Sequence, residues 1–207
     1  MDKIVYINLD DRKDRREEIE KTLSIFPREK IERFSAIKEK NGAIGCSKSH
    51  IAVLELALKN SWKNLLVLED DMLWNDQFDT QMKILEQKLS EPYDVIVLSG
   101  MNSIYDKGTL KLIRCYGTGA YIVNSSYYQT LLNNFKEGLQ KLEKYYSKKN
   151  IWNKLPPNYT EIYNLDKHWI LLQSKDNWFI VQMMYSPLGY SDVTNKEEDY
   201  SHRFKTN

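Results

Sequence analysis

The chain has 207 residues, enough for one α/β domain with a sizeable core. Its formal net charge is +1, with acids and bases mixed along the sequence, which argues against a general nucleic-acid binder because such a protein concentrates basic residues on one face. Two cysteines exclude a disulfide framework, and the sequence shows neither a signal-peptide pattern nor a long apolar run. We therefore expect a cytoplasmic protein with no membrane span.

A short apolar segment near the start predicts a β-strand that ends in a charged turn. Residues 4–9 read Ile-Val-Tyr-Ile-Asn-Leu and are rich in β-branched side chains. Asp10, Arg12 and Arg15 follow, before a helical pattern. Guanidinium groups bind phosphate oxygens bidentately, so this turn could hold a diphosphate. The alternative is a solvated charged face on the first helical turn. Residues 33–37 predict a second short strand.

A segment of small residues precedes the next predicted helix. Residues 42–50 read Gly-Ala-Ile-Gly-Cys-Ser-Lys-Ser-His, and we expect a loop that leads into a helix over about 49–60. Ser47 or Ser49 could cap this helix. Glycines beside a helix N-terminus can accept an anion, which makes this a candidate binding element. His50 could equally be a hydrogen-bonded polar residue at a helix start.

The stretch Leu-Leu-Val-Leu-Glu-Asp-Asp-Met at residues 65–72 organises the chain. Four aliphatic residues predict a strand buried on both faces, and they run into the carboxylates Glu69, Asp70 and Asp71. Ligands of open α/β sheets bind beyond the carboxyl ends of the strands. Adjacent carboxylates repel one another unless a cation compensates, and oxygen ligands suit Mg²⁺ or Mn²⁺ shared with substrate phosphates. The alternative is a polar strand end that leads into a loop.

The remaining chain continues the alternation of strands and helices, which indicates a sheet covered on both faces. The patterns predict a helix at 78–89, a buried strand at 93–100, an edge strand at 109–116, a strand at 117–123 entered through glycines, a helix capped by Ser125 or Ser126, a surface excursion over 141–159, a short helix that begins at Asp166, and a final strand at 178–183.

Several motifs together resemble glycosyltransferase family 25, which holds lipopolysaccharide sugar transferases and collagen galactosyltransferases. They are Tyr-Ile-Asn-Leu-Asp at 6–10 with Arg12, Asp14 and Arg15, then Gly45-Cys46 with Ser49-His50, then Leu68-Glu69-Asp70-Asp71, then Gly-Ala-Tyr-Ile-Val at 119–123. The resemblance implies an α/β fold of GT-A type, a Rossmann-like mixed sheet flanked by helices in a single domain over 1–207. It further implies a nucleotide-sugar-binding half at about 1–124 and an acceptor-binding half at about 125–207.

The resemblance also implies an inverting, metal-dependent hexosyltransferase. Such an enzyme moves a sugar from a nucleotide-diphosphate donor, expected to be UDP-linked, to a hydroxyl of a glycan or glycoprotein, with Mn²⁺ or Mg²⁺ as cofactor. We place the donor-binding residues at Asn8, Leu9, Asp10, Arg12, Arg15, Ser49, His50, Glu69 and Asp70, and the metal ligands at Asp71 and Glu69.

The acceptor hydroxyl must lose its proton as it attacks, and a positioned carboxylate normally accepts it. Asp166 is our first candidate because it begins a late helix in the half expected to bind the acceptor, and its alternative role is a plain N-cap. Asp192 is a rival base or a further metal ligand, and His202 could close over the metal.

Two other functional classes stay open. A nucleotidyltransferase would also use strand-end carboxylates with magnesium, but it usually adds a glycine-rich phosphate loop, and residues 4–11 contain no glycine. A non-catalytic carbohydrate-binding domain of the same fold is the other class, and the intact acidic cluster argues against it.

Overall fold

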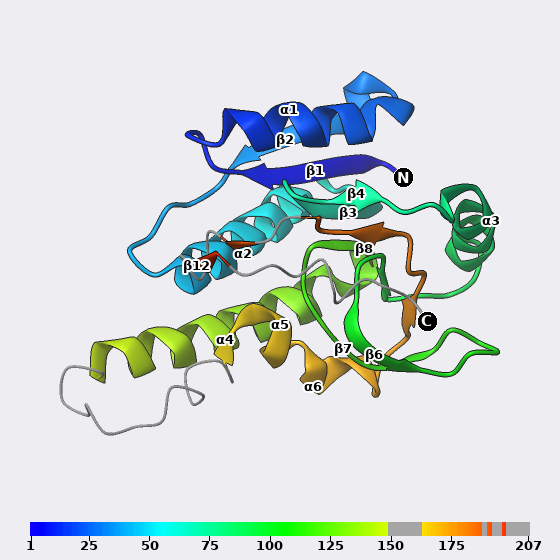
Figure 1. Ribbon diagram of the computed structural model, residues 1–207. Coiled ribbons are helices and arrows are strands. Elements are labelled where there is room, and N and C mark those ends of the chain that lie inside the picture. The colour runs from blue at the N-terminus through cyan, green and yellow to red at the C-terminus, as the bar shows by residue number, and fades with distance from the viewer. Residues whose placement is uncertain (149–162, 188–189, 192–195, 198–207) are drawn as a thin grey trace.

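The computed structural model describes residues 1–148, 163–187, 190–191 and 196–197. At its centre lies a six-stranded sheet of order β2-β1-β3-β8-β5-β9 (Figure 1). β8 is antiparallel to both of its neighbours, whereas the pairs β2–β1, β1–β3 and β5–β9 are parallel. The expected α/β class, a mixed sheet flanked by helices, is confirmed. The strands are β1 (Lys3–Asn8), β2 (Ile31–Ser35), β3 (Asn64–Glu69), β5 (Val95–Val97), β8 (Ala120–Asn124) and β9 (Trp178–Ile180).

Helices cover both faces of this sheet. α1 (Lys13–Thr22) and α3 (Phe78–Leu89) pack on one face. The other face is covered by α2 (Gly42–Asn60), α4 (Tyr128–Lys148), α5 (Leu165–His168) and α6 (Ile170–Gln173). Short 3-10 helices lie at Leu23–Ile25, Arg28–Lys30 and Ser125–Tyr127. Two-stranded pairs are formed by β4 (Leu73–Trp74) with β10 (Met184–Tyr185), β6 (Met101–Tyr105) with β7 (Leu112–Tyr116), and β11 (Tyr190–Ser191) with β12 (Lys196–Glu197).

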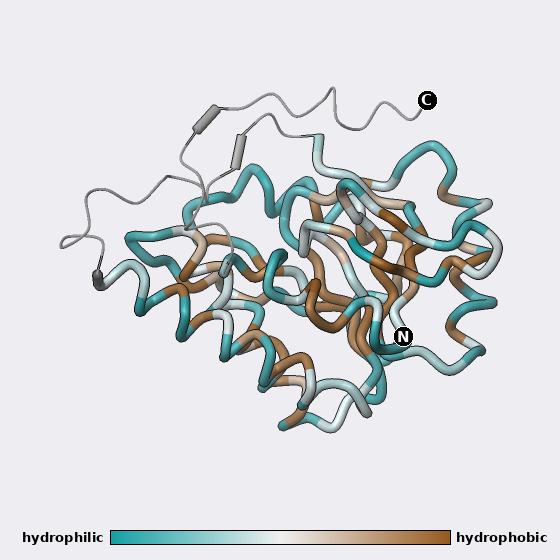
Figure 2. Tube along the Cα trace, turned by 90° about the horizontal axis from the view of Figure 1, so that it is seen from below, coloured by the Kyte–Doolittle hydropathy of each residue, from teal (hydrophilic) through white to brown (hydrophobic). Residues whose placement is uncertain are grey.

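The aliphatic run of β3 lies at the centre of the core. Leu65 and Val67 point into the cluster beneath α2 and α4, whereas Leu66 and Leu68 point into the cluster beneath α1 and α3. All four side chains are completely buried, and Figure 2 shows hydrophobic (brown) segments gathered in the interior of the molecule. Burial of each contributes about 1.5–3 kcal/mol, which fixes β3 and the carboxylates that follow it.

The loop expected over 42–48 is wrong, because α2 begins at Gly42. The side chain of Asn41 caps the helix by accepting hydrogen bonds from the backbone N–H groups of Ala43 (2.9 Å) and Ile44 (3.3 Å). A Cβ atom on Gly45 would lie 2.5 Å from the carbonyl oxygen of Ile37. A glycine is therefore needed here, because the backbones of Gly45 and Ile37 approach closely. Since Asn41 is the cap, the expectation that Ser47 or Ser49 caps this helix is wrong.

Three other expectations need correction, and one is met in part. Residues 141–148 belong to α4, and the rest of the expected excursion, 149–159, falls on residues outside the described set. Within 109–116, β7 pairs with β6 in a two-stranded ribbon, and Lys111, just before β7, forms an isolated antiparallel bridge with Phe179 of the edge strand β9. Asn124 is the cap of the 3-10 turn at Ser125–Tyr127, where its side chain accepts from the N–H of Ser126. Asp166 is the second residue of α5, whose N-cap position is Asn164.

In the part of the chain that the structure describes, no helix combines the length and the apolar character that a membrane crossing requires.

Candidate functional site

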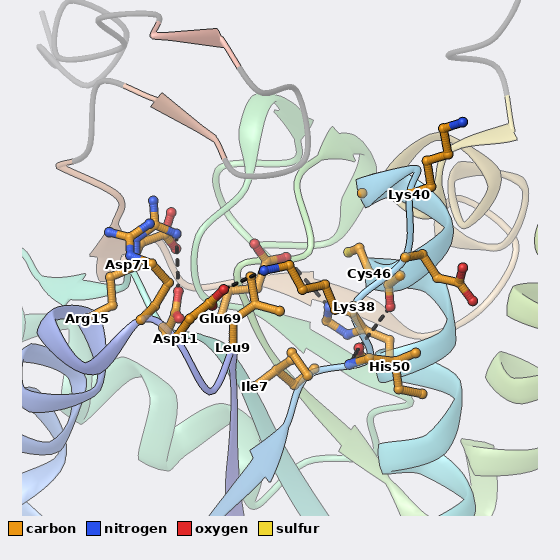
Figure 3. Close-up of a pocket in the computed structure, with 18 residues that line it drawn as sticks. Ile7, Leu9, Asp11, Arg15, Lys38, Lys40, Cys46, His50, Glu69 and Asp71 are labelled. Atoms are coloured by element: carbon orange, nitrogen blue, oxygen red, sulfur yellow. Dashed lines mark hydrogen bonds and ion pairs between the residues drawn. The ribbon is translucent and has the colours of Figure 1, made fainter.

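The carboxyl ends of three parallel strands meet at one edge of the sheet. β1 ends at Asn8, β2 at Ser35 and β3 at Glu69. Because β8 runs in the opposite direction, its start and the preceding Thr118 lie at the same edge. A pocket of about 340 Å³ opens there (Figure 3). Its lining residues are Ile7, Leu9, Asp11, Arg12, Arg15, Ala36, Ile37, Lys38, Glu39, Lys40, Gly42, Gly45, Cys46, Ser49, His50, Glu69, Asp70 and Asp71.

The pocket brings together most of the residues that the sequence proposed for donor and metal binding. Leu9, Arg12, Arg15, Ser49, His50, Glu69, Asp70 and Asp71 line it. Asn8 and Asp10 are outside this lining set. Asp10 accepts hydrogen bonds from Arg33 and from the Ser35 hydroxyl, so it fastens β1 to β2.

Asp70 is held from behind by two buried side chains. The amide of Asn8 donates to Asp70 Oδ2 at 2.7 Å, and Arg15 Nη1 lies 3.3 Å from Asp70 Oδ1. Burial raises the pKa of Asp70, and the contacts with Asn8 and Arg15 oppose this rise. Asn8 also donates to the carbonyl oxygen of Arg12 at 3.0 Å. This network therefore fixes the charged turn after β1 to the acidic end of β3.

Asp71 carries a strongly perturbed carboxyl. Its Oδ2 accepts a hydrogen bond from the Ser186 hydroxyl at 2.9 Å, whereas its buried Oδ1 has no hydrogen-bond partner among the described residues. Burial, together with the negative charges of Glu69 and Asp70, raises the pKa of Asp71 to about 7. A buried carboxylate oxygen without a partner beside two other carboxylates fits the binding of a cation.

Glu69 points away from Asp70, towards α2. Its Oε1 accepts a hydrogen bond from the Thr118 hydroxyl at 2.9 Å and lies 3.5 Å from His50 Nε2. Burial alone would raise the pKa of Glu69, but the contacts with His50 and Thr118 outweigh it and lower the pKa below its usual value. Glu69 is therefore an ionised carboxylate at the centre of the pocket.

The α2 side of the pocket carries His50 and Cys46. His50 is completely buried, and its Nδ1 lies 3.0 Å from the hydroxyl of Tyr121. Burial and the negative charge of Glu69 raise the pKa of the Cys46 thiol well above its usual value. The sequence places Cys46 in a motif of the resembled family but indicates no role for it. Its position one helical turn before His50 is a signal that becomes visible once α2 is extended to Gly42.

Basic side chains surround the mouth of the pocket. Arg12 is paired with Asp14 at 2.7 Å. Lys38 reaches across the opening and forms an ion pair with Asp11, and Lys40 stands near the start of α2 (Figure 3). No local pattern in the sequence marks Lys38 or Lys40 as binding residues. They follow β2, and its parallel pairing with β1 places them at this edge.

Ser49 has a structural role in this arrangement. Its hydroxyl accepts a hydrogen bond from the N–H of Ile37 and donates one to the carbonyl oxygen of Gly45, both at 2.8 Å. Ser49 thus holds the segment that carries Lys38 and Lys40 against α2.

Asp166 approaches the same site from the later part of the chain. Its Oδ2 accepts a hydrogen bond from the N–H of Gly117 at 3.3 Å, and Gly117 has a φ of +86°. The next residue is Thr118, which bonds Glu69. Burial raises the pKa of Asp166, and the negative charge of Glu69 adds to this rise. Asp192 and His202 lie outside the described residues.

Comparisons with known proteins bear on this site. Residues 40–115 match the family model described as glycosyltransferase family 25 (LPS biosynthesis protein). The chain has no match among the curated proteins. Three solved structures are similar at low identity. A glycosyltransferase involved in the glycosylation of the major capsid of PBCV-1 is 13% identical, over 89% of this chain and 92% of that chain, with a TM-score of 0.48. The protein A197 from STIV is 12% identical, over 89% and 83%, with a TM-score of 0.45. Mannose-1-phosphate geranyltransferase from Thermus thermophilus is 12% identical, over 88% and 75%, with a TM-score of 0.47.

The matched segment contains α2 and the acidic end of β3, which carry two of the motifs noted in the sequence. The resemblance inferred from those motifs is confirmed. The match over residues 40–115 makes this part of the chain similar to glycosyltransferase family 25 and supports an enzyme of the glycosyltransferase class, which uses a sugar donor and an acceptor.

Proposed function

We propose that this enzyme transfers a sugar from a nucleotide-diphosphate donor, UDP-linked, to a hydroxyl of a glycan or protein acceptor, with inversion at the anomeric carbon. One observation supports this most directly. The buried Oδ1 of Asp71 has no hydrogen-bond partner in the described part of the chain, and it lies beside Glu69 and Asp70 in a pocket that also contains Arg12 and Arg15.

The carboxylates at this strand end fit Mn²⁺ or Mg²⁺. Asp71 would hold the cation with Glu69, since hard divalent cations prefer oxygen ligands shared with substrate phosphates. When bound, such a cation supplies Lewis-acid neutralisation of the charge that develops on the diphosphate leaving group.

The basic side chains at the pocket mouth suit the donor diphosphate. Arg12 and Arg15 can donate paired hydrogen bonds to phosphate oxygens. Lys38 already spans the mouth to Asp11, and phosphate oxygens would offer it stronger partners there. Leu9, at the end of β1, adds an apolar wall. These groups would orient the donor so that its anomeric carbon faces the acceptor.

Asp166 is our candidate for the general base. As the acceptor oxygen attacks the anomeric carbon, the bond from that carbon to the diphosphate oxygen breaks, and the hydroxyl proton passes to the Asp166 carboxylate. A carboxyl whose pKa is raised by burial is better matched to this step near neutral pH. Asp192 is the alternative base. The division into a donor half at 1–124 and an acceptor half at 125–207 stays part of this proposal.

The experiment begins with nucleotide sugars screened in manganese for hydrolysis and transfer. Asp166→Asn should then lower transfer by about 10²–10⁴-fold and leave nucleoside-diphosphate affinity unchanged. The amide oxygen of the new side chain can still accept from Gly117, so the local fold is kept.

Asp79→Asn, an exposed position in the first turn of α3, is the matched control and should retain wild-type transfer. If Asp166→Asn transfers sugar normally and Asp192→Asn does not, the base assignment moves to Asp192.

A further inference from the structure

We propose that Cys46, His50 and Glu69 bind a thiophilic divalent cation such as Zn²⁺. In the described part of the chain, one ligand atom from each of these residues lies within 4.8 Å of the other two. A sulfur, a nitrogen and an oxygen ligand form a set that zinc prefers and that magnesium does not. This site therefore differs in its chemistry from the all-oxygen site proposed at Asp71.

Two of the ligands come from one face of a helix. Cys46 and His50 are four residues apart on α2, a spacing that brings side chains together one turn apart. Glu69 faces them from the end of β3, and Figure 3 shows the three residues around the α2 side of the pocket. Because all three line the pocket, a fourth coordination position would be open to water or to a substrate oxygen.

The buried ring of His50 indicates a ligand more specifically. His50 is 0% exposed, and its Nε2 has no hydrogen-bond partner among the described residues, although it lies 3.5 Å from Glu69 Oε1. If Nδ1–H donates to the Tyr121 hydroxyl, the lone pair of Nε2 faces the Glu69 carboxylate. In this tautomer, a cation between Nε2 and Glu69 Oε1 would take the place of the proton that otherwise joins the two side chains.

Hydrogen bonds with neighbouring hydroxyl groups would orient two of the three ligand side chains. The Tyr121 hydroxyl, 3.0 Å from His50 Nδ1, would fix the ring, as hydrogen-bond partners of metal-bound histidines do. The Thr118 hydroxyl donates to Glu69 Oε1 and fixes that carboxylate.

Binding exchanges one proton for the cation. The metal–sulfur bond forms as the proton of the Cys46 thiol leaves to solvent, because the thiolate is the ligand. Glu69 also belongs to the carboxylates proposed for the donor site, so a cation held by Cys46 and His50 would withdraw Glu69 from that site. This consequence rests on the proposed function, whereas the binding itself does not.

Cobalt titration of the full, metal-stripped chain without nucleotide tests the proposal. We expect one equivalent of Co²⁺ to give a thiolate-to-cobalt charge-transfer band with visible bands of tetrahedral cobalt, and Zn²⁺ to displace it. Cys46→Ser should abolish the charge-transfer band. Cys115→Ser is the matched control, since Cys115 is buried against Gln173, and it should keep the band.

Tyr121→Phe supplies a second test that keeps the three ligands. It should weaken cobalt affinity about 10–100-fold, as the loss of a hydrogen bond behind a metal-bound histidine does. Circular dichroism checks that each variant is folded. If Cys46→Ser does not fold, the cobalt affinity of Tyr121→Phe decides whether the proposal holds. The proposal is overturned if the chain binds no Co²⁺ stoichiometrically, if the charge-transfer band survives in folded Cys46→Ser, or if Tyr121→Phe binds as tightly as the wild type.

Discussion

Asp71→Asn should stabilise the metal-free protein at alkaline pH, although it changes a residue that we place at the centre of the site. Burial and the charges of Glu69 and Asp70 raise the pKa of Asp71 from 3.8 to about 7. Between these two values the unfolded chain has lost this proton while the folded chain retains it, so the stability of the wild type falls as the pH rises. Above about pH 7, the pKa of Asp71 in the folded state, the loss of wild-type stability caused by this group no longer changes with pH.

The size of the effect follows from the pKa shift. A rise from 3.8 to about 7 corresponds to about 4 kcal/mol at 1.36 kcal/mol per pKa unit. Three carboxylates contribute to the repulsion, and Asp71→Asn removes only one of them. The variant should therefore gain only part of this free energy of unfolding, about 1–3 kcal/mol at about pH 8. The Ser186 hydroxyl can still donate to the amide oxygen of the variant. In a chain of this length each kcal/mol raises Tm by about 2–4 °C.

Urea unfolding in a chelating buffer measures this gain. Wild type and Asp71→Asn should differ by the stated amount at about pH 8 and converge as the pH falls below about 3, where the group is protonated in both the folded and the unfolded state. Asp79→Asn, with its exposed carboxylate, should unfold like the wild type at both values. If Asp71→Asn were equally or less stable than the wild type at alkaline pH, the carboxylate cluster would not be strained in the way we describe.

Three further substitutions test separate contacts. Arg15→Met should destabilise the fold by about 3–5 kcal/mol in urea unfolding, because it leaves Asp70 buried without its ion pair; a loss below about 1 kcal/mol would contradict this. Arg12→Ala should weaken nucleoside-diphosphate binding about tenfold or more in calorimetry, since a charged hydrogen bond contributes about 1.5–3 kcal/mol, and an unchanged affinity would reduce Arg12 to a surface charge. Gly45→Ala should cost about 1–3 kcal/mol of stability, because its Cβ would lie 2.5 Å from the carbonyl oxygen of Ile37; an unaltered urea midpoint would show that the two backbones can separate.

The strand that carries the acidic cluster could be predicted because its signal is local. Four aliphatic residues before Glu69 require burial on both faces, and the structure provides two hydrophobic clusters for them. The parallel pairing of β1 with β3 then brings Arg12 and Asp70 to one edge of the sheet. This agrees with the rule that ligands of open α/β sheets bind beyond the carboxyl ends of the strands.

The start of α2 could not be predicted in the same way. A glycine pair among small residues has the composition of a loop, and what decides its structure is the approach of Ile37 to Gly45. That contact depends on how β2 pairs with β1, which no local pattern shows. The partnership of Cys46 and His50 on one helical face was hidden for the same reason.

The other contacts of the site could not be predicted because they join distant parts of the chain. Thr118 reaches Glu69 because β8 is inserted antiparallel beside β3, and Ser186 reaches Asp71 across 115 positions. Asp166 was expected at the start of a helix, whereas its link to the site runs through Gly117. Each of these contacts requires the strand order, which alternating strands and helices leave open.

Donor turnover with and without manganese, in wild type and Asp71→Asn, tests the central claim most directly. Wild-type turnover should require manganese or magnesium and vanish with chelator, because the buried carboxylates need a cation beside a diphosphate. Asp71→Asn should lose nearly all turnover while unfolding cooperatively in urea. Wild-type turnover by Asp71→Asn in manganese would contradict the placement of the metal at the end of β3.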